Sequence, residues 1–243
     1  MTGPPVPFFE ELDFRPTPIG ALSLRRRRDL RLGLDVYEIM LGHEFLMTSA
    51  FTASEVALGQ EGVAACRGEG LSVIVGGLGL GHTARAVLDA PGVARLCVVE
   101  FLDPVIEWHQ TGLLPLGEGL TSEPRCRVVE GDFFALAASA EGFDPESPGS
   151  THDAILVDID HSPDALLDTR SGGFYTPEGL ASLSRHLKPG GIFGLWSNDP
   201  PDAAFTDRLK SVFATAWPVP VTFHNPLQDR PFTQTVYLAR HGA

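Results

Sequence analysis

From residue 71 onward, short apolar runs alternate with segments in which apolar residues recur at helical spacing. The apolar runs, each of the length of a buried strand, lie near 71–76, 95–100, 126–130, 153–158 and 191–196. The helical segments lie near 82–90, 103–112, 132–139, 177–187 and 202–214. This alternation predicts a parallel sheet covered by helices on both faces.

Two further runs rich in β-formers, near 219–223 and 233–239, follow the last predicted helix. Only the proline-bearing segment 224–232 separates them, and it has no helical pattern. Strands joined without a crossover helix pair antiparallel. The predicted fold class is therefore α/β and Rossmann-like, with a C-terminal antiparallel strand pair, rather than a six-stranded dinucleotide fold.

The N-terminal part is predicted as a smaller unit. Residues 35–41 and 44–48 are rich in β-formers and meet at Gly42-His43, a pair suited to a tight hairpin turn. Residues 1–18 are rich in proline and are expected to form an arm laid over another part of the protein.

A helix is predicted to link this unit to the sheet. Thr52 and Glu55 match a capping box, so the helix should run from about 53 to 66. We expect residues 1–70 to form the N-terminal arm, β-hairpin unit and capping helix, and residues 71–243 to form the Rossmann-like domain.

Composition limits the classes of partner. The formal net charge of -13 at pH 7 does not suit a nucleic-acid surface, because phosphate binding needs a basic face. No apolar run approaches the ~18 residues of a membrane span, and no signal-peptide pattern opens the chain, so we expect a cytoplasmic protein. Cys66, Cys97 and Cys126 are far apart and predict reduced core thiols. Arg25–Arg28, the one basic cluster, is expected to bridge to acidic residues rather than bind an anion.

A glycine-rich turn follows the first predicted parallel strand. Its glycines are Gly76, Gly77, Gly79 and Gly81. Glycine lets a ligand approach main-chain N–H groups, and the start of the next helix adds a partial positive charge. His82 stands where the third glycine of the dinucleotide fingerprint would fall, so an NAD site is disfavoured. The turn predicts a nucleotide or cofactor site, with packing alone as the alternative.

Acidic residues stand just after the predicted strands, where open parallel sheets bind ligands. Glu100 ends its run at about the ~20-residue distance at which an acid binds a ribose diol. Asp132 could accept a hydrogen bond from an adenine amino group beside the N–H of Phe133, and Phe101 and Phe133 could flank the ring. These residues favour a nucleoside-bearing ligand, although Asp132 alone could equally cap a helix.

A second acidic group, Asp158, Asp160 and His161, follows the fourth run. It could take a proton from an amine, attract a cationic substrate or hold a metal ion. A metal is disfavoured because no further ligand pair stands at helical spacing. Asp160 or His161 is the predicted catalytic base, with Asp158 orienting it; the alternative is that Asp158 only caps its loop and His161 is exposed. His82 and His109 are expected to face solvent.

A series of motifs resembles, in order and spacing, those of the spermidine synthase (polyamine aminopropyltransferase) family. The motifs are Gly76–Gly81, Val98–Glu100, Val105–Glu107, Val129–Asp132, Ile155–Asp158, Phe174–Glu178 and Leu187–Gly191. The resemblance implies the class I methyltransferase fold and a site for S-adenosylmethionine or its decarboxylated form, with Glu100 at the ribose and Asp132 at the adenine. It also implies a small-molecule substrate and a homodimer.

The part that would bind the amine departs from the family pattern. Gly79 replaces the acid that would hold the aminopropyl ammonium, His161 stands at the proposed catalytic aspartate, and the Tyr-His pair expected near Glu55 is missing. S-adenosylmethionine carries a carboxylate that an acid at 79 would repel, whereas glycine would leave N–H donors exposed. We therefore favour methyl transfer from S-adenosylmethionine to a small amine or neutral acceptor.

Other functions stay open on the sequence. The runner-up is a polyamine aminopropyltransferase that uses decarboxylated S-adenosylmethionine, with Asp160 replacing the lost acid. A protein that binds a nucleoside without turnover belongs to a different class, and an NAD enzyme is a remote alternative.

Overall fold

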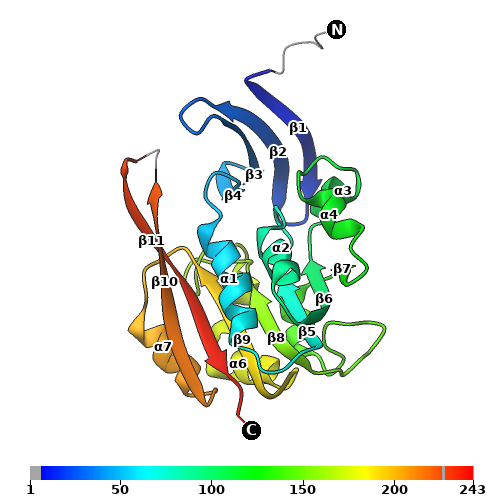
Figure 1. The fold of residues 1–243 in the computed structure, drawn as a ribbon, viewed down its shortest axis with the longest axis vertical. Helices are drawn as coiled ribbons and strands as arrows, with labels where there is room; N and C mark the ends of the chain where they lie inside the picture. The colour runs from blue at the N-terminus through cyan, green and yellow to red at the C-terminus, as the bar shows by residue number, and fades with distance from the viewer. Residues whose placement is uncertain (1–6, 226–227, 243) are drawn as a thin grey trace.

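The computed structural model describes residues 7–225 and 228–242 and contains two sheets (Figure 1). The larger sheet has seven strands in the order β10-β11-β9-β8-β5-β6-β7. Its neighbours pair in parallel from β9 to β7, whereas β11 pairs antiparallel with both β9 and β10. The predicted α/β class, with its C-terminal antiparallel pair, is confirmed.

The predicted strands and helices of this domain are present. The strands are β5 (Leu71–Gly76), β6 (Val93–Glu100), β7 (Cys126–Glu130), β8 (His152–Val157), β9 (Leu187–Ser197), β10 (Thr215–Asn225) and β11 (Arg230–Arg240). The helices are α1 (Ala53–Ala64), α2 (His82–Asp89), α3 (Asp103–Gln110), α4 (Gly117–Thr121), α5 (Phe133–Ala138), α6 (Pro177–Ser184) and α7 (Ala203–Lys210). A 3-10 helix, η1 (Thr169–Tyr175), lies between β8 and α6. Among the described residues, no helix is both long and apolar enough to cross a membrane.

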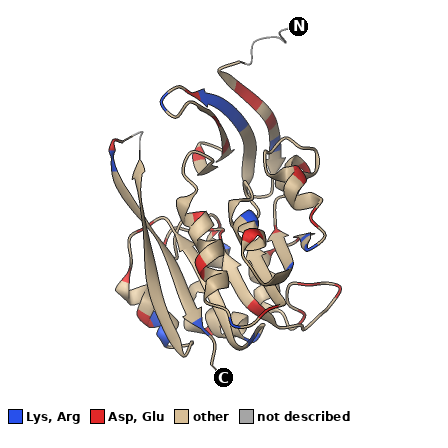
Figure 2. Ribbon diagram, in the orientation of Figure 1, with Lys and Arg blue, Asp and Glu red and all other residues tan. Residues whose placement is uncertain are grey.

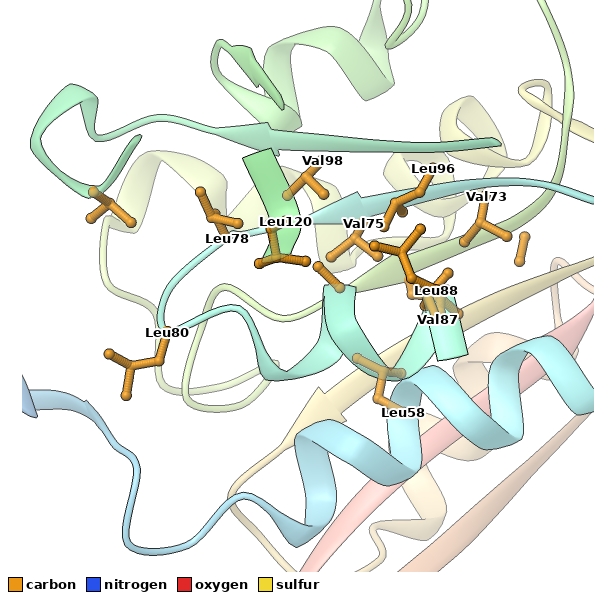
Figure 3. Packing of buried hydrophobic residues seen from close by; sticks show 14 of the residues in the cluster. Leu58, Val73, Val75, Leu78, Leu80, Val87, Leu88, Leu96, Val98 and Leu120 are labelled. Atoms are coloured by element: carbon orange, nitrogen blue, oxygen red, sulfur yellow. The ribbon is translucent and has the colours of Figure 1, made fainter. Parts of the chain in front are cut away.

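Burial on both faces explains why the central strands are continuous apolar runs. Every residue of β5 is buried, and successive residues point to opposite faces of the sheet. Val73 and Val75 pack with Leu58 in the core that contains α1 and α2 (Figure 3). Ile74 belongs to the core on the other face, with Leu180 of α6. The sheet therefore holds its carboxyl-terminal edge rigidly between two helical layers.

The N-terminal part differs from the prediction. It is a four-stranded antiparallel sheet of β1 (Phe9–Thr17), β2 (Gly20–Asp29), β3 (Leu34–Leu41) and β4 (Glu44–Thr48). The predicted hairpin is β3–β4. The prediction of an arm over residues 1–18 was wrong for residues 9–17, because they pair along β2 as a strand; residues 1–6 lie outside the described residues.

The basic cluster lies on β2, beside the acidic residues of β1 and β3 (Figure 2). Its ion pairs are Arg25 with Glu11, Arg26 with Glu10, Arg27 with both Asp29 and Glu38, and Arg28 with Asp35. Because each arginine has a carboxylate partner on the same sheet, the cluster bridges acidic residues and does not present an unpaired anion site.

Polar contacts join the small sheet to the α/β domain. Asp13 of β1 accepts a hydrogen bond from the indole Nε1 of Trp108 on α3 at 2.7 Å, and the Trp108 side chain is fully buried. Next to it, Arg15 donates to both carboxylate oxygens of Glu107, at 3.1 and 3.2 Å. These contacts fix the small sheet against α3.

Replacing Asp13 by alanine should therefore lower the free energy of unfolding by about 1–3 kcal/mol, because the buried indole N–H of Trp108 loses its acceptor. Urea unfolding monitored by circular dichroism measures the change. The control is Glu11→Ala, which removes an exposed pair with Arg25 at 3.7 Å and should change stability by less than ~1 kcal/mol. Equal losses in the two variants would contradict the assigned role of Asp13.

Candidate active site

A cavity of ≈ 610 Å³ is lined by the carboxyl ends of the parallel strands and by apolar residues of the N-terminal sheet, among them Ile39 and Met47. The predicted site residues that line it are Gly77, Gly79, Glu100, Phe101, Asp132, Phe133, Asp158 and Asp160. The predicted residues that do not line it are Gly76, Gly81 and His161. The structure thus brings most of the predicted site together at one edge of the sheet.

The glycines of the turn permit close packing of main chain. Gly77 has φ 90°, and a Cβ there would lie 2.1 Å from the carbonyl oxygen of Asp158. At Gly76 a Cβ would lie 2.6 Å from the ring of Phe133. The turn therefore sets the position of the chain that carries Asp158, and glycine is required at 77 for both backbone conformation and space.

The main-chain N–H groups of the turn already have acceptors within the protein. These donor–acceptor contacts are Gly77 to Val99 O (2.9 Å), Leu78 to Glu100 Oε2 (2.8 Å), Gly79 to Glu100 Oε2 (3.5 Å), Leu80 to Met47 Sδ (3.0 Å) and Gly81 to Leu78 O (2.8 Å). The expectation that Gly79 leaves N–H donors exposed for the carboxylate of S-adenosylmethionine was therefore wrong.

Met47 and His109 hold Gly79 from two sides. A Cβ at Gly79 would lie 2.2 Å from Cε of Met47, so this thioether side chain occupies the space of any larger residue at 79. The carbonyl oxygen of Gly79 lies 2.8 Å from Nε2 of His109, whose side chain is buried. The prediction that His109 faces solvent was wrong because α3 turns it toward the turn, and His82 is half-buried.

Glu100 lies at the end of β6, with only 7% of its surface exposed. Its Oε2 accepts from Leu78 N–H and its Oε1 from Leu102 N–H, each at 2.8 Å. Burial raises the pKa of Glu100, and these main-chain donors oppose the shift. The carboxylate lines the cavity at the predicted position.

Asp132 combines the two functions that the sequence left open. Its Oδ1 caps α5 by accepting from Phe134 N–H at 2.9 Å and Ala135 N–H at 3.2 Å. Its Oδ2 has no hydrogen-bond partner among the described residues, and Asp132 lines the cavity. Phe133 is buried and stacked on Phe143, with ring centroids 4.9 Å apart, so it forms a fixed wall rather than a free flanking ring.

Phe101 occupies the rim instead. It is 41% exposed and lines the cavity directly after Glu100. Of the two predicted aromatic residues, Phe101 is therefore the one whose ring can move onto a ligand.

Asp160 and His161 do not have the geometry of a catalytic base. Asp160 is 3% exposed and accepts from Tyr175 Oη at 2.7 Å, Leu167 N–H at 2.7 Å and Ser171 Oγ at 3.3 Å. These donors use the lone pairs of Asp160 to fasten the segment containing η1. His161 instead lies 3.2 Å from a carboxylate oxygen of Glu44. No described group of three or more His, Cys, Asp or Glu side chains is arranged to hold a metal ion.

Asp158 is the acid at the cavity with the properties of a base. It follows β8 directly and is half-buried, and its Oδ2 accepts from Thr83 Oγ1 at 2.6 Å. Burial raises its pKa to about 6. The sequence favoured Asp158 as the residue that orients the base. In the structure Asp158 lines the cavity and accepts one hydrogen bond, whereas Asp160 accepts three and His161 does not line the cavity.

Glu55 was missed as a candidate. The predicted capping box does not form, since the side chain of Thr52 makes no capping hydrogen bond and Glu55 instead contacts the hydroxyl of Ser54 at 2.8 Å. Burial, followed by the charge of Asp158, raises the pKa of Glu55 to about 7. The sequence pattern indicated a helix cap and not a site residue, because an acid three residues after Thr52 is typical of a helix start.

Comparison with known proteins gives relatives of one kind. No protein-family model matches the chain. The chain is 30% identical over 177 residues to the polyamine aminopropyltransferase of Mycobacterium tuberculosis (strain H37Rv). The matched region covers 72% of this chain and 30% of that protein. It is 34% identical over 122 residues to polyamine aminopropyltransferase 2 of Streptomyces coelicolor. Here the matched region covers 49% of this chain and 20% of that protein. The matched part thus spans less than a third of these relatives.

Solved structures share the fold. A spermidine synthase in complex with the transition state analogue AdoDATO superposes with a TM-score of 0.72 and 18% identity, over 96% of this chain and 74% of that chain. The spermidine synthase of Thermotoga maritima gives a TM-score of 0.71 and 17% identity, over 96% of this chain and 73% of that chain.

The close packing at Gly77 gives a test of the turn. Gly77→Ala should lower the free energy of unfolding by more than the 1–2 kcal/mol expected for a left-handed residue alone, because its Cβ meets main-chain atoms that cannot turn aside. The control is Gly112→Ala, where φ is 75° and no atom lies within 4 Å of the added Cβ. If denaturant unfolding gave equal losses for both, packing at Gly77 would not be the constraint.

Proposed function

Because this chain is spermidine synthase-like in sequence and fold, we propose that it transfers an aminopropyl group from decarboxylated S-adenosylmethionine to an amine acceptor. The observation that carries the proposal is the half-buried carboxylate of Asp158, which faces the cavity beside the glycine turn. A carboxylate there can both attract an ammonium group and take a proton from it.

The nucleoside would lie across the ends of β6 and β7. Glu100 accepts the ribose hydroxyls, and the unpaired Oδ2 of Asp132 accepts from the adenine amino group. The N–H of Phe133, at the first position of α5, has no intrahelical acceptor and is available to a ring nitrogen. These groups fix the sulfonium end of the ligand toward Asp158.

The charge of the cavity favours the decarboxylated ligand. S-adenosylmethionine would bring its own carboxylate close to the acids of the site, and the turn has no spare N–H donor to bind it. The decarboxylated compound carries only positive charge on its tail. The site therefore repels the first ligand and attracts the second.

The reaction requires one proton acceptor. Asp158 takes a proton from the acceptor ammonium, and the freed nitrogen lone pair attacks the aminopropyl carbon bonded to sulfur. A C–N bond forms while the C–S bond breaks, and its electron pair neutralises the sulfonium to give methylthioadenosine. The positive charge stays on the product as a secondary ammonium.

Methyl transfer is the second candidate, favoured by one observation. Gly79 provides no acid for the aminopropyl ammonium, and the apolar side chain of Met47 occupies that position. The same attack on the methyl carbon of S-adenosylmethionine would yield S-adenosylhomocysteine.

Ligand binding separates these proposals. We expect decarboxylated S-adenosylmethionine and methylthioadenosine to raise the melting temperature more than S-adenosylmethionine does at equal concentration. A ligand at 100 times its Kd stabilises the folded state by about 2.7 kcal/mol. Preferred binding of S-adenosylmethionine, with S-adenosylhomocysteine as product, would support methyl transfer, and absence of binding by all three would reject both.

Asp158→Asn should lower kcat by a factor of about 10²–10⁴, because the amide cannot take the proton. Methylthioadenosine should bind this variant with little change. Turnover is measured as methylthioadenosine release with a panel of linear monoamines and diamines. The exposed Asp164, in the same segment, provides the control Asp164→Asn, which should retain full activity. Equal kcat in both variants would exclude Asp158 as the base.

A further inference from the structure

The hydroxyl of Ser54 lies among three polar groups behind the cavity. Ser54 is fully buried at the start of α1. Its Oγ lies 2.6 Å from Oε1 of Gln234, 2.8 Å from Oε2 of Glu55 and 2.8 Å from Nε1 of Trp196. All three contacts have the length of an ordinary hydrogen bond, so each contact needs a proton between its two heavy atoms.

Counting protons assigns the charge of Glu55. The indole of Trp196 can only donate, so it uses a lone pair of Ser54. The hydroxyl has one proton, and the carbonyl of Gln234 is its nearer acceptor; Nε2 of Gln234 donates to Asn198 Oδ1 at 2.9 Å, which turns that carbonyl toward Ser54. The remaining contact, between Ser54 and Glu55, then needs a proton supplied by Glu55.

Asp158 has the opposite environment. The hydroxyl of Thr83 lies 2.6 Å from Oδ2 of Asp158 and 3.2 Å from the main-chain oxygen of Glu55. Its proton goes to the nearer carboxylate, which suits an ionised Asp158. Thr83 therefore contacts both acidic residues. The carboxylate of Asp158 has a hydrogen-bond donor, Thr83, as its neighbour, whereas the carboxyl group of Glu55 has an acceptor, Ser54.

We propose that Glu55 and Asp158 form a pair that holds one proton at neutral pH, with the proton on Glu55 and the negative charge on Asp158 at the cavity wall. Glu55 does not line the cavity, so it is a positioning residue that sets the charge of Asp158. The consequence for catalysis rests on the proposed function; the proton itself does not.

Burial and charge support the same assignment. The pKa of Glu55 is raised to about 7 and that of Asp158 to about 6, in both cases chiefly by burial. Glu55 is faced by Thr83 from α2, by Trp196 from β9 through Ser54, and by Asp158 after β8. The charge of Asp158 adds to the effect of burial in raising the pKa of Glu55.

The pair gives the site two charge states. Between about pH 6 and pH 7 it carries one negative charge, which matches one ammonium group. Above that pH Glu55 also ionises, and a second carboxylate makes Asp158 a stronger base and attracts the acceptor ammonium more strongly. We therefore expect kcat/KM to gain an additional rise through neutral pH that depends on Glu55.

Thermal unfolding tests the proton without turnover. In the unfolded chain Glu55 ionises near its ordinary pKa of 4.5, whereas in the folded protein it keeps its proton to about pH 7. The contribution of Glu55 to stability is fully present below pH 4.5 and is lost as the pH rises to about 7. Over this range the folding constant falls by about tenfold per pH unit. The melting temperature of wild type should fall more over this range than that of Glu55→Gln, which donates to Ser54 at every pH.

Activity tests the consequence. The ratio of wild-type to Glu55→Gln kcat/KM, measured with one amine, should rise severalfold through pH 7; taking the ratio cancels the ionisation of the acceptor. Glu61→Gln, an exposed acid on the same helix, is the control and should give a constant ratio. If Glu55→Gln does not fold, carboxyl carbon NMR of wild type should still show one glutamate titrating near pH 7.

Each outcome is decisive. Parallel melting curves for wild type and Glu55→Gln, or no glutamate titrating near neutral pH, would overturn the pair and imply that Gln234 donates its amide to Ser54 and leaves Glu55 ionised. A shared proton with a flat activity ratio would overturn the catalytic consequence. A shared proton in a protein that binds no adenosyl compound would reject the proposed function and support the pair.

Discussion

The hydrogen bonds from the glycine turn to the carboxylate of Glu100 are the constraint on which the site depends. They join the end of β5 to the end of β6, so the turn cannot move without moving Glu100. Because Gly77 packs against the carbonyl of Asp158, the same turn also sets the chain after β8. One acid therefore fixes the positions of the turn and of the chain that carries Asp158 together.

This arrangement changes how a glycine-rich turn works in recognition. The usual expectation is that its N–H groups face an anion, with the partial charge of the helix start behind them. Here those donors are directed at Glu100, Met47 and other main-chain groups, and the cavity gains carboxylates instead. The turn serves as a scaffold for acids, which suits a cationic ligand.

The sequence predicted the elements whose signal is local or periodic. The apolar run Val73–Val75, covered on both faces, and Glu100 at its expected distance both lie where periodicity placed them. Roles that depend on which donors reach a side chain over long sequence separation were not predictable. Asp160 and Asp158 are two residues apart, yet Asp160 is saturated by the η1 segment and Asp158 is not. The capping pattern at Glu55 failed because this side chain contacts the hydroxyl of Ser54 and makes no capping hydrogen bond.

The acids around the cavity have an energetic cost that a ligand can offset. Glu100 is buried, Glu55 and Asp158 are half-buried, and none of the three forms an ion pair with a described lysine or arginine. Main-chain donors and hydroxyls compensate only part of the lost hydration. A sulfonium or ammonium group would supply the missing opposite charge, so a bound cation would offset part of this cost. An anionic tail on the ligand would add to the cost, so under the proposed function the net charge of the ligand is the property on which selectivity depends.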